Sequence, residues 1–189
     1  MLNYREALDR LRALPLYQEN LLWGTPRRGH PEGSLANHIN ELEANLETIA
    51  ELLLPDEEDK LRLLIHVHDI CKPDAWVGVD SDHPNNHALL ARRLLEKVCP
   101  DPVLLAITQF HDDGYILYQY YRRSGDLRGR LTGVLQAVQQ VDLFLLFFLI
   151  DSCTAGKLSE PVDWVLATVA QQMAVPARVL EVRQRLALV

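Results

Sequence analysis

Histidine and aspartate residues that could bind a metal ion are the chemically most informative feature of this chain. In the mostly apolar segment 63–71, His68 is directly followed by Asp69. A buried carboxylate beside an imidazole is costly unless it is paired or binds a metal. Imidazole nitrogens and carboxylate oxygens are good ligands for Mn, Fe, Co, Ni and Zn. His68 and Asp69 are therefore candidate metal ligands.

Further histidines and an aspartate lie on other predicted helices. His38 falls in the first turns of a helix, His87 begins one and His111 ends one. Asp151 ends the apolar run 143–150, so burial would again leave a carboxylate in need of a partner. Adjacent residues on a helix diverge by about 100°. One helix can supply only part of a ligand set, and the rest must come from these other helices.

The order of these residues resembles the HD superfamily, which is named for its His-Asp doublet. The family pattern is a histidine, a later His-Asp pair, often two more histidines and a final aspartate, and the matching positions are His38, His68, Asp69, His87, His111 and Asp151. Residues 68–73 read His-Asp-Ile-Cys-Lys-Pro and look like the family's His-Asp-Ile-x-Lys-Pro. The resemblance covers about residues 34–156. Members are all-α and mostly hydrolyse phosphate esters.

The resemblance implies roles for each of these residues. One metal would take His38, His68, Asp69 and Asp151. Asp69 would bridge to a second metal held by His87 and His111, and in members with one metal these two histidines would contact the substrate phosphate instead. The implied cofactor is one or two divalent transition metals, which lower the pKa of bound water and polarise a phosphoryl group.

Lys72 is the remaining residue to which the resemblance gives a role. It lies one helical turn after His68, where its ammonium could contact a phosphate oxygen. Asp69 and Lys72 are the expected catalytic residues. Lys72, His87 and His111 are the expected substrate contacts.

The expected activity is hydrolysis of a phosphomonoester or phosphodiester, such as that of a nucleotide or an RNA end. The same ligands would serve the di-iron oxygenases of the superfamily, and a non-catalytic regulatory or binding module is a third hypothesis. The sequence fixes neither the metal, nor the natural substrate, nor the oligomeric state.

Several nearby residues compete with these assignments. Asp142 is the rival of Asp151, but the two are nine positions apart, which on a helix means opposite faces and roughly 13 Å of rise. Asp112 follows His111 at a helix end and is predicted to be exposed. The remaining histidines are predicted to be structural or without a role: His30, His66 and His83.

Composition sets the frame for these hypotheses. The 189 residues, 48% of them hydrophobic and 24% charged, predict one all-α domain, with a motif-bearing core at about 34–156 and C-terminal helices at about 161–188. The net charge of −7 argues against duplex nucleic acid or an anionic membrane as partner. Three scattered cysteines favour a reducing cytoplasm. The expected partner is a phosphorylated small molecule or nucleotide.

Apolar periodicity and the placement of proline and glycine predict the helices. Ser34, Asp56 and Asp101 are the expected N-caps. The predicted helices are Asn3–Leu14, 35–54, 57 to about Lys72, His87–Val98, Pro102–His111, Tyr115–Tyr121, Leu131–Asp151, and two that start near Pro161 and Pro176, with a polar link over Arg122–Gly129.

Overall fold

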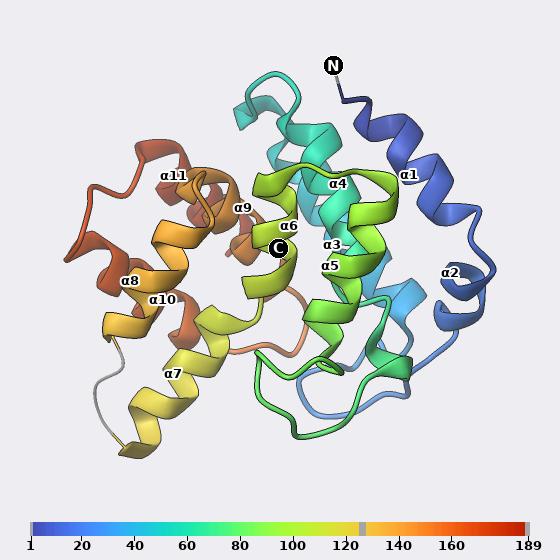
Figure 1. Ribbon diagram of the computed structural model, residues 1–189. Coiled ribbons are helices and arrows are strands. Elements are labelled where there is room, and N and C mark those ends of the chain that lie inside the picture. Colours follow the sequence, from blue (N-terminus) through green and yellow to red (C-terminus); the bar gives the residue numbers. More distant parts are fainter. Residues whose placement is uncertain (1, 125–127, 188–189) are drawn as a thin grey trace.

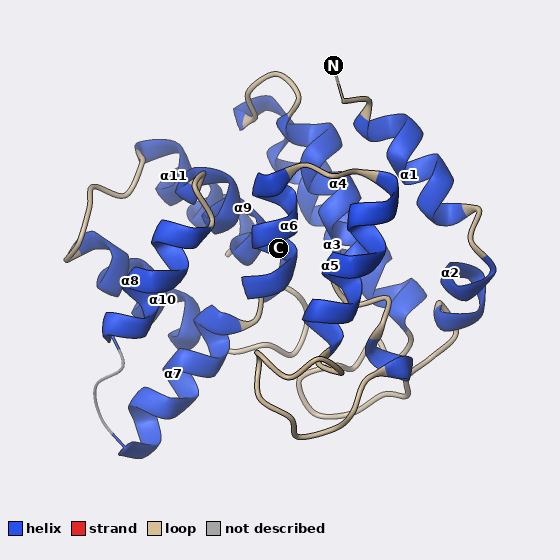
Figure 2. Ribbon diagram, in the orientation of Figure 1, coloured by secondary structure: helices blue, strands red, loops and turns tan. Residues whose placement is uncertain are grey.

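Helices and their connections account for all the regular structure that is described. The structure is a computed structural model that describes residues 2–124 and 128–187 (Figure 1). Among these residues there is no β-strand, and the only β-type pairing is an isolated bridge between Arg27 and His30 (Figure 2). The predicted all-α fold is confirmed. Part of the predicted polar link, residues 125–127, lies outside the described residues.

Two of the three expected N-caps, Ser34 and Asp101, make the predicted hydrogen bonds, whereas Asp56 precedes α4 with a φ of 69° and makes no capping hydrogen bond. Ser34 Oγ accepts a hydrogen bond from the backbone N–H of Asn37, and Asp101 accepts one from the N–H of Val103 at 2.8 Å. The α-helices are α1 (Tyr4–Arg12), α2 (Pro15–Asn20), α3 (Leu35–Ile49), α4 (Glu57–Val67), α5 (His87–Val98), α6 (Pro102–Phe110), α7 (Asp113–Ser124), α8 (Arg128–Ala137), α9 (Val141–Ser152), α10 (Glu160–Ala170) and α11 (Ala177–Leu186), and the 3-10 helices are η1 (Ala50–Leu52) and η2 (Lys72–Asp74).

Helices α4 and α9 occupy the centre of the core. α4 packs against α1, α3, α5, α6 and α9. Every residue from Leu143 to Ile150 of α9 is buried, as expected for a helix that is apolar on all sides. Burial of each such leucine or phenylalanine side chain contributes about 1.5–3 kcal/mol. These two helices carry His68, Asp69 and Asp151 at or beside their ends, so the core fixes the position of all three.

In the described part of the chain, no single helix is long and apolar enough to cross a membrane. The segments Gly129–Ala137 and Val141–Ser152 meet the criteria of length and composition only when taken together, and a bend of 110° separates them.

This bend corrects one prediction, since the expected single helix Leu131–Asp151 is wrong. The chain turns at Gln139, which has a φ of 59° and so lies in the left-handed region. A left-handed backbone costs conformational energy for residues other than glycine, and no Gly or Pro in the sequence indicates a turn here. The turn lets Val134 of α8 and Phe144 of α9 reach the same core.

The end of α4 also differs from the prediction. The helix stops at Val67, and Lys72 opens the 3-10 helix η2 rather than extending α4. Asp69 therefore lies in the turn between two helical segments. At the other end of the chain, Pro15 not only follows α1 but starts α2, a helix that the sequence analysis missed.

Candidate metal centre

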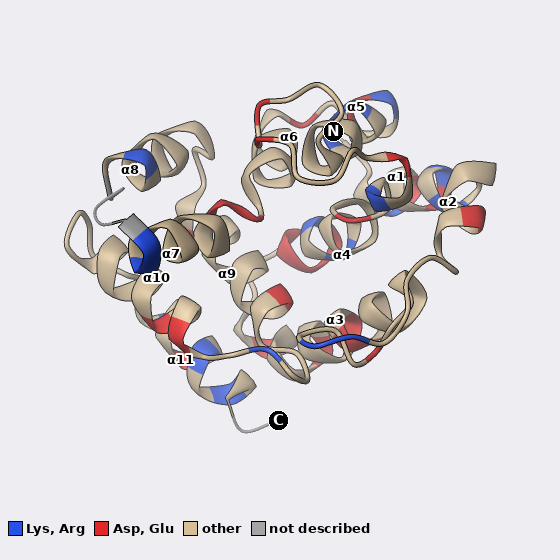
Figure 3. Ribbon diagram, turned by 90° about the horizontal axis from the view of Figure 1, so that it is seen from below, with Lys and Arg blue, Asp and Glu red and all other residues tan. Residues whose placement is uncertain are grey.

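Five helices present the predicted ligands at one end of the molecule. His38 lies in the first turns of α3 and His87 begins α5, whereas His68 and His111 are the C-caps of α4 and α6. Asp151 is near the end of α9. The relevant ends of α3 to α6 are the lower ones in Figure 1. Figure 3 views the molecule from this side and shows acidic segments on α3, on α4 and between α6 and α7.

His38, His68 and Asp151 form the first of two ligand groups. Their ligand atoms all lie within 4.8 Å of one another. Oδ1 of Asp151 is 3.1 Å from Nε2 of His38 and 3.9 Å from Nε2 of His68. Oδ2 of Asp69 is 3.4 Å from Nε2 of His68 and 4.0 Å from Nε2 of His38. Two imidazoles and two carboxylates thus converge on one position.

Asp69, His87 and His111 form the second group, again with all ligand atoms within 4.8 Å. Oδ1 of Asp69 is 3.5 Å from Nε2 of His87 and 3.4 Å from Nε2 of His111. The two oxygens of Asp69 therefore face different groups. This is the geometry of a carboxylate that can bridge two cations.

Backbone contacts orient two of the histidines. Nδ1 of His68 is 3.0 Å from the carbonyl oxygen of Ile65, and Nδ1 of His111 is 2.8 Å from that of Thr108. A carbonyl only accepts, so each Nδ1 carries the proton and donates it. In the neutral form of each ring, Nε2 then presents its lone pair to the cluster, as metal binding requires.

Three buried atoms of the ligand residues make no hydrogen bond: Nε2 of His68, Oδ1 of Asp69 and Nδ1 of His38. A buried polar atom without a partner is costly, and a cation between the groups would satisfy Nε2 of His68 and Oδ1 of Asp69. The mixed nitrogen and oxygen donors suit divalent Mn, Fe, Co, Ni or Zn. The residues present therefore fit a metal ion and leave its identity open.

Two lysines lie against the carboxylates. Lys72 Nζ donates to Oδ2 of Asp69, and Lys157 Nζ donates to Oδ1 of Asp151 at 3.0 Å. Burial alone would raise the pKa of both carboxyl groups. The charge of Lys72 and the contacts of His68 and His111 together outweigh burial for Asp69. The charge of Lys157 and the contacts of His38 and His68 do so for Asp151, and both pKa values fall well below their usual range. Both carboxylates are ionised and available as ligands.

Of these two lysines, only Lys72 was singled out from the sequence. Lys157 follows Gly156 in the connection between α9 and α10, and no periodicity or motif marks it. Lys72 touches Asp69, as its proximity in the chain suggests, but from η2 and not from the same face of α4 as His68.

Asp112 is closer to the site than the sequence predicted. Its side chain is only 37% exposed, and its Oδ2 lies 3.1 Å from Nε2 of His87. Its Oδ1 lies 3.5 Å from Nε2 of His111. Burial lowers the pKa of His111, but the charge of Asp112 and the hydrogen bond with Asp69 outweigh it and raise this pKa to about 9. The sequence feature that could have indicated Asp112 as a site residue is the second His-Asp doublet, His111-Asp112.

Asp142 and His66 lie apart from the cluster, in agreement with the sequence analysis. Asp142 Oδ2 is 3.3 Å from a guanidinium nitrogen of Arg178. His66 faces Glu43, with 3.0 Å between Nε2 and Oε1, and Tyr17. Asp151 rather than Asp142 thus lies with the two histidines, and His66 has polar partners outside the cluster, as expected for a structural residue.

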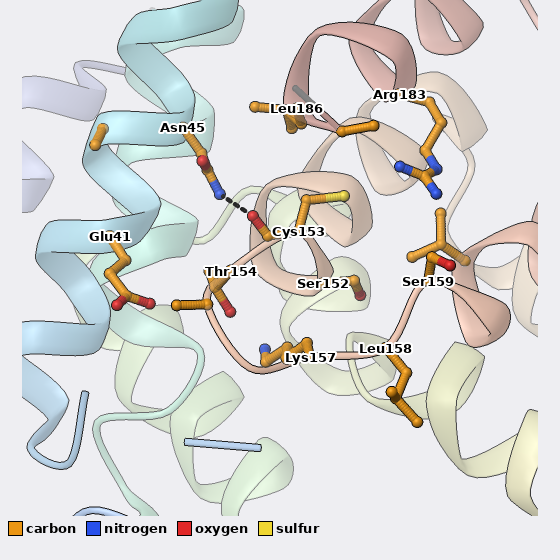
Figure 4. A pocket seen from close by; sticks show the side chains of 14 residues that line it. Glu41, Asn45, Ser152, Cys153, Thr154, Lys157, Leu158, Ser159, Arg183 and Leu186 are labelled. Atoms are coloured by element: carbon orange, nitrogen blue, oxygen red, sulfur yellow. Dashed lines mark hydrogen bonds between the residues drawn. The ribbon is translucent and has the colours of Figure 1, made fainter. Parts of the chain in front are cut away.

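A cavity of about 580 Å³ lies between α3, the α9–α10 connection and α11, and no candidate ligand lines it. Its wall includes Glu41 and Asn45 of α3, Lys157, and Arg183 of α11, as Figure 4 shows. Asn45 spans from α3 to the end of α9 by donating to the carbonyl oxygens of Ile150 and Cys153. Lys157 both lines the cavity and donates to Asp151, so this lysine connects the cavity with the first ligand group.

The cluster as a whole combines four imidazoles, three carboxylates and two ammonium groups at the ends of packed helices. Such a set could hold one or two divalent cations and place positive charge beside them. Comparison of the chain with protein-family models, with curated proteins and with solved structures found no match.

Proposed function

We propose that this protein is a metal-dependent phosphohydrolase of the HD type. The observation that carries the proposal is the position of Asp69, whose two oxygens face two separate histidine groups. Asp69 directly follows His68 and precedes Lys72, as in the HD pattern. The other residues of that pattern lie close to Asp69 in the folded chain.

The ligands divide between two positions. One cation would be held by His38, His68 and Asp151, and the other by His87 and His111. Asp69 would bind both cations. We add Asp112 to the second position, because its carboxylate reaches both histidines of that group. When bound, the metal supplies Lewis acidity to the phosphoryl group and a lowered pKa to water.

Lys72 would bind the substrate phosphate. Its side chain remains 22% exposed while its ammonium lies on Asp69. Burial lowers the pKa of Lys72, but the charges of Asp69 and Asp112 outweigh this and raise it, so the ammonium is retained at neutral pH. A fixed positive charge beside the phosphoryl group stabilises the charge that develops as the ester bond breaks.

The substrate class is a phosphomonoester or phosphodiester, such as that of a nucleotide or an RNA end. The chain is acidic overall, so an anionic substrate depends on local positive charge. Lys72, Lys157 and the metal provide that charge. The cavity next to Asp151 offers room for the organic part of the ester.

The test is hydrolysis of p-nitrophenyl phosphate and bis-p-nitrophenyl phosphate by protein purified without a histidine tag. Each assay is run with Mn, Fe, Co, Ni or Zn added and again with a chelator. We expect nitrophenol release that depends on the metal and is abolished by His68→Ala. Two bound irons and oxygen uptake without hydrolysis would replace the proposal with an oxygenase. No metal and no turnover would leave a binding module.

A further inference from the structure

We infer that Glu32 is a positioning residue for His38. Glu32 lies in the loop before α3, and its side chain is only 3% exposed. Its Oε1 is 3.4 Å from Nδ1 of His38 and 2.9 Å from Nδ1 of His30. Gly33 fixes this loop, since it has a φ of 80° and a Cβ there would lie 2.8 Å from Cδ of Pro26. The loop thus places the buried carboxylate of Glu32 next to Nδ1 of His38, the ring nitrogen that faces away from Asp151.

The other histidines of the cluster show why this contact matters. His68 and His111 donate from Nδ1 to backbone carbonyls, whereas His38 faces a carboxylate with its Nδ1. In the structure Nε2 of His38 donates to Oδ1 of Asp151, and Nδ1 is buried without a hydrogen bond, 3.4 Å from Oε1 of Glu32. A cation bound at Nε2 would displace that proton, and the neutral ring would then carry its proton on Nδ1, next to Glu32. A carboxylate that accepts the Nδ1–H proton fixes this tautomer and makes Nε2 a stronger ligand.

The charge of Glu32 is not balanced by a lysine or arginine. Among the described residues its only partners within ion-pair distance are His30 and His38, and its Oε2 is buried without a hydrogen bond. A buried carboxylate with neutral partners is unfavourable. A cation on Nε2 of His38 would make Nδ1–H a stronger donor and so compensate this charge. Glu32 therefore gains its hydrogen-bond partner, Nδ1–H of His38, when the metal is bound.

A direct metal-binding role for Glu32 is the competing interpretation. The ligand atoms of His30, Glu32 and His38 also lie within 4.8 Å of one another. A cation there would bind Nδ1 of His38 and leave Nε2–H donating to Asp151, so His38 would no longer be a ligand of the first group. The positioning role requires only the neutral imidazole. It also predicts that the first group binds its cation more tightly than the second and fills first.

The inference rests on the proposed metal-binding role of His38, and its test measures metal affinity without any assay of activity. Cobalt(II) is titrated into metal-free protein in competition with a chelator. Glu32→Gln keeps the shape and an accepting oxygen but removes the charge. We expect it to weaken the tighter cobalt equivalent about 10- to 100-fold, the usual effect of losing an outer-shell partner. The cobalt visible spectrum should shift as well.

Glu43→Gln is the matched control, because Glu43 makes the same kind of contact with His66, outside the cluster. It should leave both cobalt affinities unchanged. Equal affinities in wild type and Glu32→Gln would overturn the inference. Complete loss of one cobalt equivalent, with the others unchanged, would overturn it in favour of a ligand role. A wild type that binds no cobalt would overturn the proposed function together with the inference.

A second measurement does not depend on the variant folding. Nitrogen-15 shifts of the imidazoles in wild-type protein report which nitrogen of His38 carries the proton. We expect the proton on Nε2, which donates to Asp151, in metal-free protein, and on Nδ1 once Zn(II) binds at Nε2. Zinc bound at Nδ1 would overturn the inference.

Discussion

Nε2 of His38 lies 3.1 Å from Oδ1 of Asp151, although the two residues are 113 positions apart in the chain. The contact joins the first turns of α3 to the end of α9, whose residues Leu143–Ile150 are all buried in the core. The first ligand group therefore exists only when α3, α4 and α9 are docked. A cation bound there holds the folded state together and has no comparable site in the unfolded chain.

Metal should accordingly stabilise the wild type and not a variant that lacks Asp151. At a metal concentration about 100 times the dissociation constant, the free energy of unfolding should rise by about 2.7 kcal/mol. Asp151→Ala should abolish this increase, because the cation loses its carboxylate. Asp142→Ala is the control on the same helix and should retain it. Thermal unfolding with and without chelator measures the effect, and the opposite pattern would move the ligand to Asp142.

Asp112→Asn should release one metal and keep the other. The carboxylate contacts His87 and His111 but neither histidine of the first group within ion-pair distance. Elemental analysis of a wild type that holds two metals should therefore give about one equivalent for this variant. Retention of both would exclude Asp112 as a ligand.

Lys72→Met should lower kcat/KM by about 10²- to 10³-fold, as the loss of one group that stabilises developing charge typically does. Metal content should stay the same, because the Lys72 ammonium donates a hydrogen bond to Asp69 and is not itself a metal ligand. Phosphatase assays at saturating metal give the first quantity and elemental analysis the second. Loss of metal together with activity would show that Lys72 supports the ligands instead.

The Glu57–Arg178 pair predicts how stability depends on pH away from the site. Burial raises the pKa of Glu57, but the hydrogen bonds from Arg178 and the N–H of Leu54 outweigh it and lower the pKa below 4.5. A carboxyl group whose pKa is lower in the folded state stabilises the fold above about pH 4.5. This stabilisation is lost as the pH falls through the folded-state pKa.

Glu57→Gln should therefore cost about 1–3 kcal/mol at pH 7, since the pair is mostly but not fully buried. The difference from wild type should shrink as the pH falls below about 4.5. Urea unfolding at several pH values measures it. A difference that stays constant to pH 3 would show that lost packing, and not lost charge, accounts for the effect.

Sequence reasoning predicted the elements whose causes are local. Ser34 and Asp101 cap the helices that they were expected to cap, and the ends of the apolar stretches placed His87, His111 and Asp151 at helix ends. The order of histidines and aspartates then indicated which helix ends meet. These features need only neighbouring residues or a recognised order along the chain.

The features that were missed depend on tertiary contacts. Gln139 takes a left-handed conformation because the core needs α8 and α9 to diverge, and nothing in its identity announces this. Glu32 and Lys157 reach the cluster from loops, where no periodicity indicates direction. Asp112 was predicted to be exposed because it follows a helix end, but α7 begins at the next residue and keeps it against His87.

The central claim is that Asp69 joins two metal positions, and the most direct test is the metal content of the purified, untagged protein beside that of Asp69→Ala. We expect about two equivalents of a divalent transition metal in the wild type and a loss from both positions in the variant, whose circular dichroism should stay helical. A folded wild type that binds no transition metal, or an Asp69→Ala variant that keeps both equivalents, would contradict it.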